Sequence, residues 1–193
     1  PDGMPLVWGL RWLGVPRQSR VYGPDLMLGL CQRAAREQIP IYLYGGAPAV
    51  LERLRSNLEE WFPGLAIAGT HAPPFRSLTP AEDAADIEQI RASGAAIVFV
   101  GLGCPKQERW MAQHHGRLPA VMVGVGAAFD FHSGRVSQAP RWMMARGLEW
   151  LYRLLKEPQR LWRRYLIYNP AFICLFGWQL FQNWLQRVRN LSP

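Results

Sequence analysis

Three short strings hold residues that suit proton transfer and the binding of a phosphorylated ligand. Asp2 stands in Asp-Gly-Met-Pro-Leu-Val-Trp, where a carboxylate beside glycine fits either a general base or a turn. Lys106 and Gln107 stand in Gly-Cys-Pro-Lys-Gln-Glu-Arg-Trp and offer a cation and an amide, or simply a first helical turn. Asp130, in Gly-Val-Gly-Ala-Ala-Phe-Asp-Phe, fits a ribose or base contact, or an Asx turn.

The sequence offers no metal site or nucleophile of the usual kinds. It has no Asp-x-Asp pair, so a metal-bridged diphosphate site is not encoded, and we expect a metal-independent protein without a cofactor. The four histidines lack metal-ligand spacing, which favours structural or solvated roles. They are His71, His114, His115 and His132. The three cysteines are too far apart for a disulfide framework, and Cys104 has no histidine or acid in a recognisable relation to it.

Four apolar runs of strand length must position these strings. Each contains a glycine at its end and lacks polar alternation, which is typical of strands buried on both faces. The runs are residues 41–46, 65–69, 96–101 and 120–126. Because helical patterns separate them, we predict an α/β fold with a Rossmann-like, mostly parallel sheet and helices on both faces.

Glycines follow three of these runs, at the edge where parallel sheets bind ligands. They let the backbone turn and let a phosphate approach N–H groups at a helix start, although simple turning is the plainer interpretation. The candidate nucleotide-binding glycines are Gly45, Gly46, Gly103 and Gly126. Phe129 stands where a dinucleotide fingerprint requires its third glycine, which counts against the alternative of a nucleotide-binding oxidoreductase.

Helical patterns lie between and after the strands. Residues 24–38, 47–61 and 105–115 have helical spacing or a helix-starting proline, and Thr79-Pro-Ala-Glu82 is a capping signal. After residue 134 we predict one helix over 138–157 and another from Pro158 to about 168, ended by Asn169-Pro170. The apolar, aromatic segment 171–185 is too short and too polar for a membrane span, and is predicted to be interfacial or packed on the domain.

The net charge of +8 is concentrated in the last third of the chain. Residues 135–193 contain ten arginines and lysines but only two acids, whereas residues 1–134 are neutral. Such a segment attracts the phosphates of nucleic acid or of an anionic membrane surface. The basic residues alternate with Trp and Leu and form no nucleic-acid reader motif, which favours a membrane surface and no nucleic acid.

Six strings, in order over residues 2–164, resemble the WecG/TagA/CpsF glycosyltransferases. They are the three strings above with Tyr-Gly-Gly-Ala-Pro, Ala-Pro-Arg-Trp, and Gly-Leu-Glu-Trp-Leu-Tyr-Arg followed by Glu-Pro-Gln-Arg. The resemblance implies inverting transfer of N-acetylmannosamine, its uronate, glucose or a similar sugar from a UDP-sugar. The implied acceptor is a sugar linked to polyprenyl diphosphate, such as undecaprenyl diphosphate, in teichoic acid, exopolysaccharide or other cell-surface polymer synthesis.

The resemblance also implies roles for individual residues. Asp2 matches the general base, Arg20 matches an arginine near the acceptor or diphosphate, and Gln107 and Asp130 match the nucleotide site. Three arginines match those of a C-terminal appendage that folds over the site, and their spacing puts them on one face of a continuous helix. They are Arg153, Arg160 and Arg163.

We therefore predict two regions. Residues 1–134 form the UDP-sugar-binding catalytic domain, with further residues expected before Pro1 because family members carry them. Residues 135–193 form a helical appendage for membrane docking and closure of the active site.

The expected location is the cytoplasm, peripheral on the inner face of the plasma membrane, and a homo-oligomer is compatible with the sequence. The string His71-Ala-Pro-Pro-Phe departs from the family's His-Gly-Tyr-Phe, so a different substrate pocket is expected. A basic membrane-surface interaction protein without catalysis is a further alternative.

Overall fold

The computed structural model describes residues 1–190, without the side chains of Arg160, Arg164 and residues 187–190. The chain divides into two compact units. The sheet unit is Val21–Gln138, and the helical unit combines Pro1–Arg20 with Ala139–Pro193. The division lies close to the predicted boundary at residue 134, but the first twenty residues group with the C-terminal helices. The roles predicted for the two regions stay predictions.

The sheet unit is built on four parallel strands, which confirms the predicted α/β fold. They are β1 (Ile41–Gly45), β2 (Ile67–His71), β3 (Ile97–Gly101) and β4 (Val121–Gly124), in the order β2-β1-β3-β4. The pairing of β1 with β3 is regular from Ile41 opposite Ile97 to Gly45 opposite Gly101. Strands β1 and β3 therefore end at the same edge of the sheet, each at a glycine.

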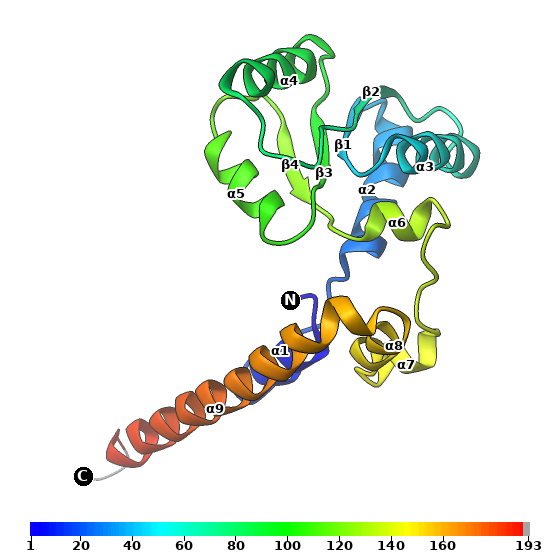
Figure 1. The fold of residues 1–193 in the computed structure, drawn as a ribbon. Helices are drawn as coiled ribbons and strands as arrows, with labels where there is room; N and C mark the ends of the chain where they lie inside the picture. Colours follow the sequence, from blue (N-terminus) through cyan, green and yellow to red (C-terminus); the bar gives the residue numbers. More distant parts are fainter. Residues whose placement is uncertain (191–193) are drawn as a thin grey trace. The chain divides into compact units, whose positions relative to one another are not determined.

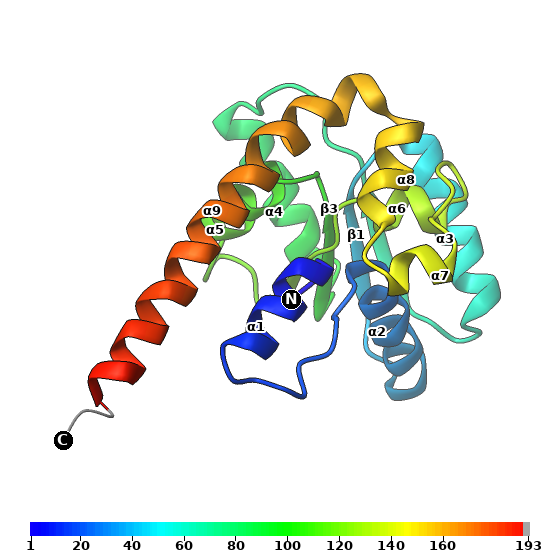
Figure 2. The ribbon, with the colours of Figure 1, turned by 90° about the horizontal axis from the view of Figure 1, so that it is seen from below.

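Helices cover both faces of this sheet (Figures 1 and 2). One face carries α2 (Gly23–Glu37), α3 (Pro48–Trp61) and α6 (Ala128–His132), and the other carries α4 (Pro80–Ala92) and α5 (Lys106–Gln113). Successive side chains of β1 point to opposite faces of the sheet, as in any β-strand. Ile41 and Leu43 join the first core, while Tyr42 and Tyr44 join the second. The predicted capping box is confirmed, because Thr79 and Glu82 bond reciprocally at the start of α4.

The prediction that all four strands are buried on both faces is wrong for β2 and β4. Every residue of β1 is buried, and the middle of β3 is buried. By contrast, no residue of β2 or β4 is fully buried, and Val121 is 65% exposed. The reason is their position, since both are edge strands of the described sheet and have a neighbour on one side only.

The helical unit contains α1 (Met4–Trp12), α7 (Arg141–Ala145), α8 (Glu149–Lys156) and α9 (Pro158–Asn190). The single helix predicted over 138–157 is therefore wrong, because the chain turns between α7 and α8 at Gly147. This glycine has φ +72°, and a Cβ there would lie 2.9 Å from the Trp8 ring and 3.1 Å from Met4 Cβ. A side chain at this position would strain the backbone and collide with α1.

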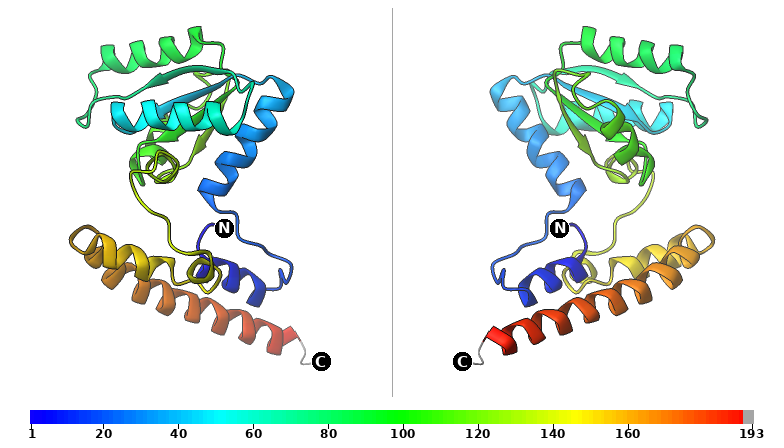
Figure 3. Two further views of the ribbon diagram at one scale, coloured as in Figure 1. Left: turned by 90° about the vertical axis from the view of Figure 1, so that its right-hand side faces the viewer. Right: turned by 90° about the vertical axis from the view of Figure 1, so that its left-hand side faces the viewer.

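The predicted break at Asn169-Pro170 is also wrong. Figure 3 shows α9 as one long helix with α1 beside it, and Pro170 lies in its interior. Proline removes one helical hydrogen bond, but the stacking of Phe176 against Trp12 and Phe172 holds the following turns in place. Within residues 1–190, no helix is both long and apolar enough to cross a bilayer.

Candidate active site

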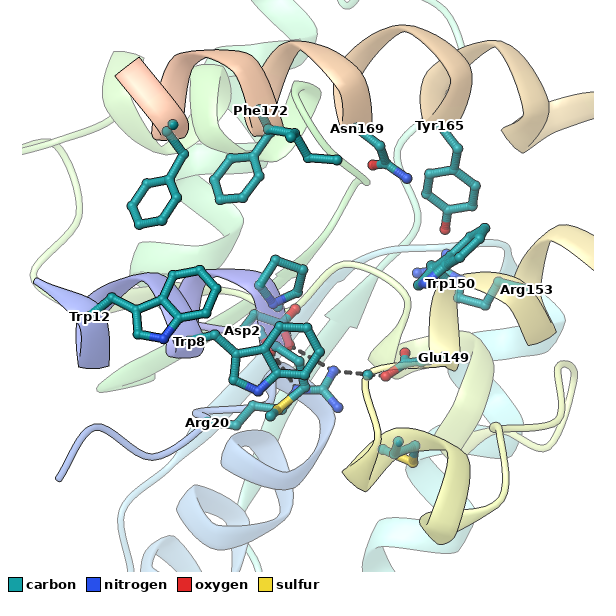
Figure 4. A pocket seen from close by; sticks show the side chains of 18 of the residues that line it. Asp2, Trp8, Trp12, Arg20, Glu149, Trp150, Arg153, Tyr165, Asn169 and Phe172 are labelled. Carbon is teal, nitrogen blue, oxygen red and sulfur yellow. Dashed lines mark hydrogen bonds and ion pairs between the residues drawn. The ribbon is translucent and has the colours of Figure 1, made fainter. Parts of the chain in front are cut away.

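A pocket of about 720 Å³ lies within the helical unit, between α1, α8 and α9 (Figure 4). Its charged lining residues are Asp2, Arg20, Glu149 and Arg153. Its aromatic lining residues are Trp8, Trp12, Trp150, Tyr165, Phe172 and Phe176. Three of the residues predicted for catalysis are thus brought to one pocket, although Asp2 and Arg153 lie far apart in the sequence.

Arg20 is the centre of the charged cluster. Its Nη2 donates to Glu149 Oε2 at 2.7 Å and to Asp2 Oδ1 at 3.2 Å, and its Nε donates to the backbone carbonyl of Asp2. The Arg20 side chain is 18% exposed and that of Glu149 is 14% exposed. Because one guanidinium binds both the backbone and the carboxylate of Asp2, it fixes where that carboxylate lies in the pocket.

Asp2 stands just before α1, whose first turn is set by Gly3 and Pro5. Desolvation raises the pKa of the Asp2 carboxyl, Arg20 lowers it through charge and a hydrogen bond, and Glu149 raises it again; the net pKa is raised. The Asp2 side chain is still 64% exposed in the open pocket, so water and ligands reach it. A carboxylate with a raised pKa is a better proton acceptor than an ordinary one, which suits a general base.

Glu149 balances the charge of Arg20. Burial lowers the pKa of Arg20, but the hydrogen bond and charge of Glu149, with those of Asp2, outweigh it and the net pKa is raised. Glu149 is the first residue of α8, where a negative charge interacts favourably with the helix dipole. Arg153 follows one helical turn later and lines the same pocket, and its charge lowers the pKa of Asp2.

The other two predicted arginines are not seen in this pocket. Arg163 lies on α9 with its guanidinium 5.3 Å from the centre of the Trp162 ring, and its side chain is exposed. The side chain of Arg160 lies outside the described residues. Among the described side chains, Arg153 alone of the three lines the pocket.

The predicted nucleotide-binding glycines lie at the carboxyl ends of β1, β3 and β4 in the sheet unit. Gly45, Gly46, Gly103 and Gly126 all have positive φ, so the backbone at these turns takes conformations that glycine allows. At Gly45 the approach is also close, since a Cβ would lie 2.6 Å from the carbonyl carbon of Gly101.

Gln107 joins two of these turns. Its Oε1 accepts from the Gly126 backbone N–H at 3.0 Å, while its Nε2 donates to Glu108 Oε1 at 3.0 Å. The residue is 6% exposed, so its amide is buried together with these two partners. Its geometry is that of a positioning residue, because it holds the turn after β4 against the start of α5.

The two remaining predicted residues are Asp130 and Lys106. Asp130 is in α6, with its side chain 37% exposed and 3.4 Å from the guanidinium of Arg135. Lys106 is exposed and lines a second pocket, of about 700 Å³, together with Arg109 and Arg117. None of the four glycines, nor Gln107 or Asp130, lines that second pocket, and the nucleotide-binding roles stay predictions.

Three of the four histidines have structural partners, as predicted. His71 Nε2 lies 3.0 Å from Asp86, and His114 Nε2 lies 3.0 Å from Asp83. His132 Nε2 lies 3.0 Å from the Pro24 carbonyl, and burial lowers its pKa. In the part of the chain that the structure describes, no group of three or more histidines, cysteines or acids is arranged to hold a metal ion.

Sequence reasoning missed several residues of the pocket. Glu149 stands in one of the six family strings but was given no role, and its partner Arg20 lies 129 positions away. Tyr165 and Asn169 were hidden because a helix break was predicted beside them. Their spacing with Phe172 and Phe176 follows one helical face, and that periodicity was the available signal.

Two comparisons with known proteins gave matches. The model of the "Glycosyl transferase WecG/TagA/CpsF family" matches residues 1–186. The chain is 37% identical over 167 residues to the N-acetylglucosaminyldiphosphoundecaprenol N-acetyl-beta-D-mannosaminyltransferase of Bacillus spizizenii (strain ATCC 23059 / NRRL B-14472 / W23). That match covers 86% of this chain and 63% of the relative, so the chain spans less than two thirds of the relative's length.

Proposed function

Because the chain belongs to the WecG/TagA/CpsF family of glycosyl transferases, we propose that it transfers a sugar from a UDP-sugar to a sugar carried on polyprenyl diphosphate. The relative's name describes transfer of an N-acetyl-β-D-mannosaminyl group to N-acetylglucosaminyldiphosphoundecaprenol. We propose the same class of acceptor here, with N-acetylmannosamine, its uronate, glucose or a similar sugar as the transferred group. The product serves teichoic acid or exopolysaccharide assembly.

The observation that carries the proposal is the Asp2 carboxylate, held by Arg20 in a largely aromatic pocket. In an inverting transfer the acceptor hydroxyl attacks the anomeric carbon as the bond to UDP breaks. The hydroxyl proton goes to a carboxylate, and the leaving diphosphate gains negative charge. Asp2 supplies the carboxylate, and its raised pKa suits the task.

The charge on the leaving diphosphate requires donors and cations. We propose that the glycine turns of the sheet unit supply backbone N–H groups for the UDP moiety. We propose that these groups act without a metal ion. Arg160 and Arg163 are proposed to assist when the donor is bound.

The surface of α9 supports docking on an anionic membrane, as a peripheral protein at the inner face of the plasma membrane. Large apolar side chains of this helix are exposed, including Leu175 at 71%, Trp178 at 60% and Trp184 at 58%. Tryptophan favours the headgroup layer, and nearby basic residues are attracted to anionic lipids. A lipid-linked acceptor holds its diphosphate in that layer, so an enzyme docked there meets it directly.

The test of the catalytic role is Asp2→Asn, which keeps the shape but removes the base. Transfer from UDP-N-acetylmannosamine to a water-soluble N-acetylglucosamine-diphosphate-lipid analogue should fall by about 10²–10⁴. UDP affinity, measured by calorimetry, should stay close to that of the unchanged protein and serves as the control for folding. A variant that keeps more than about a tenth of the rate removes Asp2 as the base.

The donor is tested separately by comparing UDP-N-acetylmannosamine, UDP-N-acetylglucosamine and UDP-glucose with the same acceptor. Transfer from one of them, with inversion at the anomeric carbon shown by NMR, supports the proposal. Absence of transfer from all three UDP-sugars overturns it.

A further inference from the structure

The pocket that holds Asp2 continues past the charged cluster as an apolar groove. Its walls there are Trp8 and Trp12 of α1 and Phe172, Phe176 and Leu180 of α9. Figure 4 shows Phe172 pointing from α9 toward the two tryptophans, with Tyr165 and Asn169 farther back along the same helix near Trp150. The pocket therefore has a polar end and an aromatic end.

The order of residues along α9 sets this polarity. Tyr165, Asn169, Phe172, Phe176 and Leu180 recur at helical spacing and share one face. The first two carry a hydroxyl and an amide, and the next three are apolar. From Phe172 to Leu180 the helix rises about 12 Å at 1.5 Å per residue, so the aromatic end is elongated rather than spherical.

The groove is open to solvent, although the Trp12 and Phe176 rings that line it stack with their centroids 6.1 Å apart. Trp12 is 66% exposed although it lines the groove, and a Cβ built on Gly177 meets no atom within 4 Å. Gly177 lines the same groove from the interior of α9. Glycine lowers helix stability, so this position costs the helix some stability but leaves the groove free of a side chain. A volume of about 720 Å³ for the whole pocket lies in the range of small-molecule sites.

We propose that this groove binds the first isoprene units of a polyprenyl diphosphate, with the diphosphate at the end lined by Arg153, Tyr165 and Asn169. The inference rests on the proposed function and deepens it, because it assigns the lipid part of the acceptor to a protein surface rather than to the bilayer alone. Charge complementarity orients the ligand. Arg153 attracts the diphosphate to the polar end, and the chain can then extend only along the aromatic end.

The groove is distinct from the exposed apolar side chains of α9 that support membrane docking. Trp178 and Leu175 are exposed and do not line the groove. The two surfaces make different predictions, since docking depends on a vesicle, whereas the groove binds a short prenyl diphosphate in solution.

The experiment measures binding by calorimetry, in detergent-free buffer, of inorganic diphosphate, geranyl diphosphate and farnesyl diphosphate. In the unchanged protein we expect affinity to rise at least about tenfold from inorganic to farnesyl diphosphate, as apolar surface is buried. Gly177→Leu fills the groove while favouring the helix, and should remove most of this chain-length gain. Gln179→Leu adds the same side chain at an exposed position of α9 outside the groove and should keep the gain.

Each result bears on the proposal. Equal affinity for the three ligands, or an equal loss in Gly177→Leu and Gln179→Leu, overturns the groove. A concentration-dependent dimer that Gly177→Leu disrupts, without a chain-length effect on binding, also overturns it and makes the groove an interface between copies. Because the assay contains no UDP-sugar, the groove can fail while glycosyl transfer is still observed, and the absence of transfer does not alter the binding result.

Discussion

The bridge from Arg20 to Glu149 is the contact on which the geometry of Asp2 depends, and its strength can be measured. The two side chains meet at 2.7 Å and are only 18% and 14% exposed, so solvent screens them weakly. A charge-assisted hydrogen bond of this kind contributes about 1.5–3 kcal/mol. The bond from Arg20 to the Asp2 carboxylate is longer, at 3.2 Å, and Asp2 is 64% exposed, so it contributes under about 1 kcal/mol.

A double-mutant cycle on urea unfolding tests this difference. Arg20→Gln, Glu149→Gln and the double variant should give a coupling of about 2 kcal/mol. The matched cycle with Arg20→Gln and Asp2→Asn should give less than half of that. A coupling between Arg20 and Glu149 below about 0.5 kcal/mol would refute the reasoning.

The same variants should move the pH dependence of kcat/KM in opposite directions. Arg20 lowers the pKa of Asp2 and Glu149 raises it. Arg20→Gln should therefore shift the acidic limb of the profile to higher pH, and Glu149→Gln should shift it to lower pH. Shifts in the same direction, or no shift in either variant, would show that Asp2 does not titrate in that limb.

Three further predictions concern the rest of the molecule. Gln107→Ala should weaken UDP binding at a cost of about 1–3 kcal/mol, because the half-buried Gly126 N–H loses its acceptor, and unchanged UDP affinity by calorimetry would contradict this role. Transfer should persist in EDTA, and strict dependence on added Mg²⁺ or Mn²⁺ would contradict the metal-free proposal. The Arg76 and Thr79 contacts lower the pKa of Glu82 to about 2, from an ordinary value of 4.5, so its contribution to stability is present above about pH 4.5 and lost as the pH falls toward 2. The free energy of unfolding of Glu82→Gln should therefore fall less steeply as the pH is lowered from about 4.5 toward 2. A pH dependence of stability equal to that of the unchanged protein would contradict this contribution of Glu82.

The sheet unit follows from its sequence because its signals are local. The apolar runs at β1 and β3, the capping box of Thr79 and Glu82, and the glycines that end the strands each act within a few residues. The edge strands were mistaken for buried ones because an apolar run does not reveal its place in the sheet. Strand order depends on contacts between distant residues, which periodicity does not encode.

The helical unit was harder to predict for the same reason. Pro170 is a local signal for a helix end, yet the packing of Phe172, Phe176 and Trp12 outweighs it. Arg20 and Glu149 are 129 positions apart, and the sequence around each residue does not indicate that they form an ion pair. The family resemblance drew attention to Asp2, Arg20 and Arg153, which line one pocket, but the other residues of that pocket were identified from the structure alone.

The discontinuous make-up of the helical unit has a consequence for how the chain folds. Val21–Gln138 is a contiguous segment, whereas α1 must wait for α8 and α9 before its contacts exist. During synthesis the sheet unit therefore emerges whole while the first helix has no partner. The entropy cost of bringing α1 to α8 and α9 grows only with the logarithm of the number of residues between them. The time before α1 finds its partners therefore depends more on the order of synthesis than on the size of the sheet unit that separates them. Arg20, which positions the Asp2 carboxylate, acquires its partner Glu149 only after the residue 129 positions later has been made.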